Sequence, residues 1–98
     1  MSGLSHVPPE HGGRVVLRRS DVSGERANYA IELLTPEHRY NGTARVVIAD
    51  GRVELEAPDE APEWLLSLTK TLLRGAWRSS NVSGFPRRLT RWREAPKA

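Results

Sequence analysis

Apolar and polar residues alternate along the first half of the chain, as they do in strands that bury one face. Between residues 27 and 35, Tyr29, Ile31 and Leu33 fall on one side of the predicted strand. The other side carries Asn28, Ala30, Glu32 and Leu34. The partly β-branched run at residues 14–19, which precedes a turn-rich segment, predicts an earlier strand. The first half of the chain is therefore predicted to form an antiparallel sheet.

The clearest local signal is a hairpin centred on Asp50-Gly51, a dipeptide favoured in two-residue type I′ turns. Strands are predicted at residues 40–49 and 52–56, and this turn fixes their register. The register places apolar pairs on one face and polar pairs on the other. The predicted pairs are Ile48–Val53 and Val46–Leu55 on the apolar face, and Val47–Glu54 and Arg45–Glu56 on the polar face.

After Pro58 the spacing of apolar residues changes to the period of a helix. A helix is predicted from about Glu60 to Arg74 or Arg78, with Asp59 as its N-cap and Pro62 in its first turn. A broad apolar stripe suits packing on a sheet. The stripe comprises Ala61, Leu65, Leu68, Leu72 and Ala76, widened by Leu66, Leu73 and Trp77.

The C-terminal segment leaves two alternatives open. Residues 89–93 are predicted either as a strand or as an extended segment held by Phe85, Leu89 and Trp92. The fold class is α+β: an antiparallel meander of three to four strands, one C-terminal helix packed on one face, and a basic extended segment. The predicted organisation is a flexible tail at 1–13, a single domain at 14–93 and a frayed end at 94–98.

Length and composition limit the classes of protein. A chain of 98 residues and 11.0 kDa accommodates one domain with a small core. The absence of cysteine excludes disulfides, thiolate metal sites and cysteine nucleophiles. No apolar run is long enough for a transmembrane segment, and the first residues lack the pattern of a signal peptide. The expected location is therefore the cytoplasm.

Charge is unevenly distributed along the chain. Residues 1–63 carry seven basic and eleven acidic side chains, a net charge of −4, whereas residues 64–98 carry eight basic and one acidic, a net charge of +7. Such asymmetry produces a local field that attracts anions. The basic C-terminal third is therefore the first candidate for a binding site.

We expect this region to engage an acidic partner, either nucleic acid or an acidic protein surface, without catalysis. Arginine suits phosphate and carboxylate, and tryptophan stacks on unpaired bases. The candidate residues are Lys70, Arg74, Arg78, Arg87, Arg88, Arg91, Trp92 and Arg93, with Trp77 nearby in sequence.

The alternative hypothesis is a protein-interaction or homodimerisation module that uses the exposed sheet face or edge. A sheet covered by a single helix has a second face, which is predicted to carry Arg45, Val47 and Glu54, with Tyr40 or Leu34 as further members.

No residue pattern indicates catalysis, a cofactor or a metal. His6 and His11 fall in the predicted tail and His38 in a predicted turn, so their spacing does not suit a metal site. The glycines do not form a phosphate-binding loop, because Gly12-Gly13 lacks the lysine of such a motif.

Overall fold

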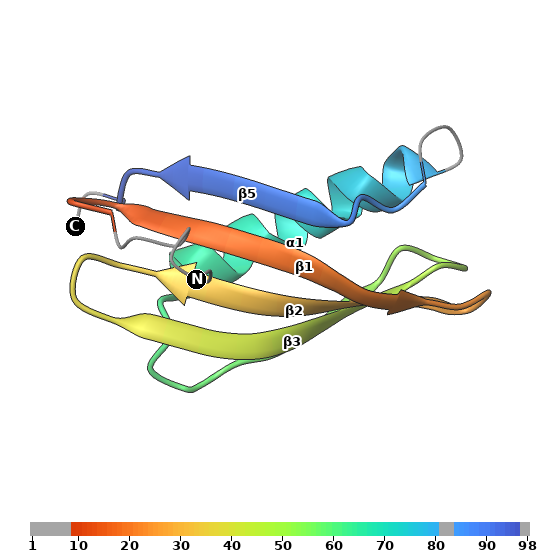
Figure 1. The fold of residues 1–98 in the computed structure, drawn as a ribbon, viewed down its shortest axis with the longest axis horizontal. Helices are drawn as coiled ribbons and strands as arrows, with labels where there is room; N and C mark the ends of the chain where they lie inside the picture. Colours follow the sequence, from red (N-terminus) through yellow and green to blue (C-terminus); the bar gives the residue numbers. More distant parts are fainter. Residues whose placement is uncertain (1–8, 81–83, 97–98) are drawn as a thin grey trace, which may run out of the picture.

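The computed structural model describes residues 9–80 and 84–96. Its elements are β1 (Gly13–Val22), β2 (Arg26–Leu34), β3 (Arg39–Val47), β4 (Val53–Glu56), α1 (Glu63–Arg78) and β5 (Arg88–Arg93). The strands form one antiparallel sheet in the order β4-β3-β2-β1-β5, and α1 crosses behind it (Figure 1). The predicted α+β class is confirmed, and the C-terminal segment supplies a fifth strand beside the first.

The core lies between α1 and one face of the sheet. Strand residues two apart share a face, so Val15 and Leu17 of β1 point the same way as Ile31 and Leu33, their partners on β2. The alternation predicted for β2 is therefore confirmed. The fully buried core side chains include Val15, Leu17, Tyr29, Leu33, Val46, Leu65, Thr69 and Leu73.

The turn between β3 and β4 differs from the predicted one. Val46 pairs with Val53 and Arg45 with Glu54, a register shifted by two residues from the prediction. The turn contains Ile48, and Gly51 follows it with a φ of 75°. The shift preserves which residues share a face, because a displacement of two residues leaves the alternation unchanged.

Contacts outside the hairpin account for this longer turn. The backbone N–H of Ile48 donates to the Glu25 carbonyl at 2.9 Å, and the Trp77 indole N–H donates to the Ile48 carbonyl at 2.8 Å. A Cβ on Gly51 would lie 2.6 Å from the Trp77 ring. Tertiary packing therefore overrides the local preference of Asp50-Gly51 for a two-residue turn.

The helix begins later than predicted. It starts at Glu63, its N-cap is Pro62 rather than Asp59, and Pro62 makes no side-chain capping bond. The residue before a proline is disfavoured in helical conformation, so Ala61 does not extend the helix. The buried line is also displaced around the helix axis, to Leu65, Thr69, Leu73 and Ala76. Leu68 and Leu72, which were assigned to the stripe, are only partly buried.

Two side chains hold the connection that leads into β5. The Tyr29 hydroxyl donates to the Pro86 carbonyl at 2.6 Å, and the Arg19 guanidinium donates to the Phe85 carbonyl at 2.7 Å. Phe85 itself is buried in the core. These contacts fix the chain where it returns from α1 to the sheet.

Candidate functional site

Strand β5 divides the basic residues of the C-terminal third between two faces of the sheet. Leu89 pairs with Leu17, a core residue, so Leu89 faces the helix. By alternation Arg91 and Arg93 share that side, whereas Arg88, Thr90 and Trp92 lie on the opposite face. The sequence did not assign these faces, because polarity does not alternate cleanly over residues 88–92.

The backbone of β5 presents hydrogen-bonding groups outward. β5 is the last strand of the sheet, and no strand lies beyond it among residues 9–80 and 84–96. The Arg19 N–H donates to the Arg87 carbonyl at 2.9 Å, so every second residue from there, including Leu89 and Arg91, bonds toward β1. Thr90 and Trp92 therefore point their N–H and carbonyl groups away from the sheet.

An apolar groove lies between β5 and α1. Its volume is about 530 Å³. Leu68 and Leu72 form its helix side, and Leu89 lies on its strand side. Gly75 also lines the groove, and the space where its Cβ would lie is open. The complete lining is Leu68, Thr71, Leu72, Gly75, Ala76, Ser79, Gly84, Pro86, Leu89 and Arg91.

Arg91 is the charged residue of this groove lining. Its side chain is exposed, and no ion pair joins it to a carboxylate within the described part of the chain. Arg93 lies two residues further along the same side of the strand. The groove therefore combines an apolar floor with a cationic end.

The opposite face of β1 and β5 is also basic. Arg14 pairs with Trp92, and Arg18 pairs with Arg88. Between them Val16, which is 2% exposed, faces the same way. β1 and β5 carry no carboxylate on this face within residues 14–18 and 88–92, whereas Glu32 of β2, which pairs with Val16, forms an ion pair with Arg39 at 3.0 Å. Both sides of the β5 edge thus carry positive charge.

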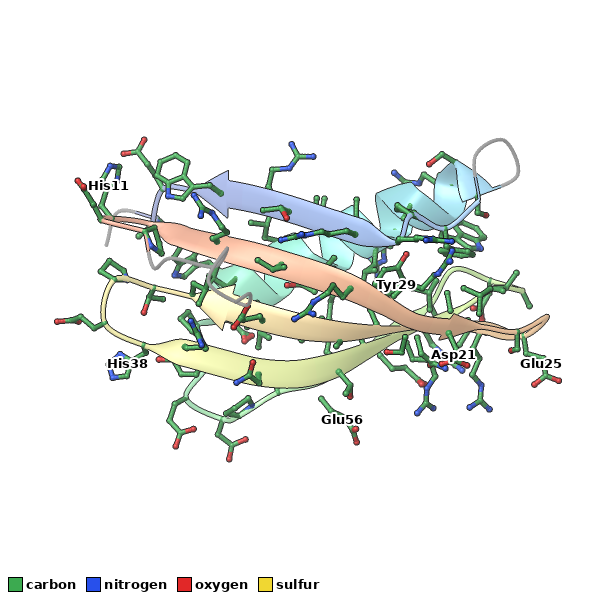
Figure 2. The ribbon with its side chains drawn as sticks, in the orientation of Figure 1. His11, Asp21, Glu25, Tyr29, His38 and Glu56 are labelled. Carbon is green, nitrogen blue, oxygen red and sulfur yellow. The ribbon has the colours of Figure 1, made fainter. Side chains whose placement is uncertain are left out.

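Trp92 packs against the start of β1 and keeps 40% of its surface exposed. Its indole N–H donates to the His11 carbonyl at 2.9 Å, and its ring meets the His11 ring edge-on at 5.3 Å. Gly12, with a φ of 73°, lies beneath the indole. Figure 2 shows His11 at the end of the sheet where β5 finishes.

The remaining predicted residues lie elsewhere. Lys70, Arg74 and Arg78 are exposed on α1, and the latter two line a hollow of about 430 Å³ at the β3–β4 turn. Trp77 packs on that turn and does not approach Trp92's face of the sheet. Arg87 is exposed just before β5. The structure therefore brings together Arg88, Arg91, Trp92 and Arg93 around β5, on its two faces, and places the helical cations apart.

The sheet face that the sequence predicted for dimerisation does not expose all of the residues assigned to it. Tyr40 packs on the helix side, because it pairs with the core residue Leu33. Leu34 is fully buried and offers no exposed surface. Arg45 and Glu54 form an ion pair at 3.4 Å on this face, with Val47 partly buried nearby.

Within residues 9–80 and 84–96 no group of histidine and acidic side chains is arranged to hold a metal ion. Figure 2 shows His38, together with His11, at one end of the sheet, far along the strands from Asp21. His6 lies outside the described residues. None of the helices in the described part of the chain has the length and apolarity to cross a membrane.

Sequence reasoning missed the groove because it assigned Leu68 and Leu72 to the core. One signal was present: Gly75 interrupts the apolar flank of an otherwise strong helix and leaves a gap there.

A comparison with known families, curated proteins and solved structures finds no match to this chain.

Proposed function

We propose that this protein is a non-catalytic binding module that pairs the outer edge of β5 with an extended, acidic segment of a partner protein. The observation that carries the proposal is the coincidence of an outward-facing strand edge with arginines on both of its sides. Addition of a strand to such an edge is a recurring mode of peptide recognition, in which main-chain hydrogen bonds provide affinity.

Backbone geometry supports the edge as the contact. Thr90 and Trp92 direct their N–H and carbonyl groups outward, so an added strand can continue the ladder. The groups on Leu89 and Arg91 remain bonded to β1. The incoming strand therefore needs no rearrangement of the sheet.

Charge supports an acidic partner. An added strand projects successive side chains to opposite faces of the sheet, so it meets Arg91 and Arg93 on one side and Arg88 on the other. Glu94 is the one acidic residue among residues 64–98. A carboxylate on either face of the added strand would thus meet cations.

The separation of the cations favours a peptide over a nucleic acid. A phosphate backbone that lies across one face contacts only the basic residues of that face. A strand that pairs with the edge of β5 contacts the basic residues of both faces at once.

The test is fluorescence polarisation of the full chain with a labelled, capped ten-residue peptide of alternating Glu and Val. We expect saturable binding that weakens as salt is raised, because exposed charge pairs are screened. The matching peptide of alternating Lys and Val should not bind. Equal binding of the two peptides would contradict the charge argument.

A variant isolates the strand edge. Thr90→Pro removes an outward N–H that does not belong to the β1–β5 ladder, and proline is accepted at such positions on edge strands. We expect a loss of at least about tenfold in affinity, with the circular dichroism spectrum unchanged. The control Thr90→Val keeps the N–H and should bind as the parent does.

Two outcomes would assign the edge to another partner. A single-stranded oligonucleotide that binds more tightly than the Glu–Val peptide, and does so regardless of Thr90→Pro, would overturn the proposal in favour of nucleic acid. A dimer in light scattering that Thr90→Pro converts to monomer would show that a second copy occupies the edge.

A further inference from the structure

We infer that the groove between α1 and β5 selects the partner's sequence: it receives a large apolar side chain, and Arg91 pairs with an acidic side chain two residues away. This inference rests on the proposed function, since the side chains belong to the strand that pairs with β5. It adds a spacing rule that strand addition alone does not contain.

The spacing follows from the strand geometry. Leu89 and Arg91 lie two residues apart on the helix side of β5, and both line the groove. On an added strand, the residues beside them also lie two apart and point to the same side. The residue between them points to the opposite face, toward Thr90's side, and does not enter the groove.

The chemistry of the lining assigns the two positions. Beside Leu89 the groove is bounded by Leu68, Leu72 and Pro86, so burial there favours an apolar side chain. At Arg91 an exposed guanidinium lacks a carboxylate partner in the described part of the chain, so an acidic side chain is favoured. The preferred pattern is an apolar and an acidic residue separated by one residue.

The probe is a set of capped nine-residue threonine peptides that each carry one Leu and one Glu. Peptides with these residues two apart, tested in both orders because the added strand runs in either direction, are compared with peptides that separate them by three. We expect the better of the two-apart peptides to bind about tenfold more tightly than either three-apart peptide. Equal affinities across the set would overturn the inference.

A groove-filling variant tests the same point from the protein side. A Cβ on Gly75 meets no atom within 4 Å and the residue lines the groove, so the side chain of Gly75→Leu starts in open space and adds apolar bulk to the groove. We expect it to abolish the advantage of the two-apart spacing. The matched control, Ser67→Leu, adds the same side chain at an exposed helix position outside the groove and should retain the advantage.

The failure of the two proposals is distinguishable. If strand addition is wrong, the alternating Glu–Val peptide does not bind, or Thr90→Pro leaves its binding unchanged. If only the groove is wrong, that peptide binds and is sensitive to Thr90→Pro, yet spacing and Gly75→Leu have no effect on affinity.

Discussion

The indole N–H of Trp77 donates a hydrogen bond of 2.8 Å to the carbonyl oxygen of Ile48 and so joins the end of α1 to the turn between β3 and β4. Trp77 is partly buried, and it packs against the core. This contact connects the helix to the β3–β4 side of the sheet, which is opposite the β5 edge. It also explains why the β3–β4 turn departs from the local preference of its sequence.

Replacing Trp77 tests this contact. Trp77→Phe keeps an aromatic ring but removes the indole donor, so the Ile48 carbonyl loses its partner. We expect the free energy of unfolding to fall by about 1–3 kcal/mol, measured by urea denaturation. The exposed indole of Trp92 provides a comparison, because Trp92→Phe removes a hydrogen bond at the surface and should cost less.

Gly51 beneath the same ring is predicted to be sensitive to substitution. Gly51→Ala places a side chain at a φ of 75°, where its Cβ lies 2.6 Å from the indole. We expect a loss of at least about 1 kcal/mol in thermal or urea denaturation. Gly24→Ala is the matched control, since a Cβ there meets no atom within 4 Å and its backbone is outside the positive-φ region. Equal stability of the two variants would show that the turn tolerates rearrangement.

Deprotonation of Tyr29 is expected to lower the free energy of unfolding at high pH. Burial raises the pKa of its hydroxyl above the ordinary value near 10, and the nearby Arg19 partly opposes this shift. Because the pKa in the folded chain exceeds that in the unfolded chain, the stabilisation is complete below the unfolded value and is lost as pH rises through the folded one. Stability measured against pH should therefore decline above about 10.

The variant Tyr29→Phe separates this titration from other alkaline effects. It lacks the hydrogen bond to Pro86 and should be less stable at neutral pH. Its stability should fall less steeply above pH about 10, so the curves of the two proteins converge. Parallel curves would mean that Tyr29 does not account for the decline.

Gly75 offers a stabilising substitution. Alanine has a higher helix propensity than glycine, and a Cβ at this exposed position meets no neighbouring atom. We expect Gly75→Ala to raise the free energy of unfolding by about 0.5–1 kcal/mol. A decrease in the denaturation midpoint would indicate that the groove wall is less open than its geometry implies.

The strands could be located from sequence where a local pattern and the tertiary structure agree. Tyr29, Ile31 and Leu33 alternate with Ala30 and Glu32, and their burial follows this alternation as far as Leu33; Leu34, on the other face, is buried as well. The register of the hairpin could not be located in this way, because it depends on contacts made by Ile48 with Glu25 and Trp77, which are distant in sequence.

The candidate site, too, could be predicted only in part from the sequence. Its composition was evident in the arginines near the C-terminus, but their distribution over two faces depends on β5 pairing with β1. Local polarity around Leu89 and Trp92 does not specify that partner. The groove escaped detection for a related reason: the apolar stripe of the helix is wide, and only tertiary contacts determine which flank remains uncovered.

The pairing of β1 with β5 has a consequence for synthesis of the protein on the ribosome. β1 leaves the ribosome early, yet its neighbour β5 is synthesised only after the helix. Until then, the apolar stretch Val15–Leu17 has backbone hydrogen-bonding groups without a partner strand on that side. The nascent chain is then most vulnerable to aggregation, and completion of the sheet ends that interval. Slowing translation after Arg78 should therefore lower the yield of native protein.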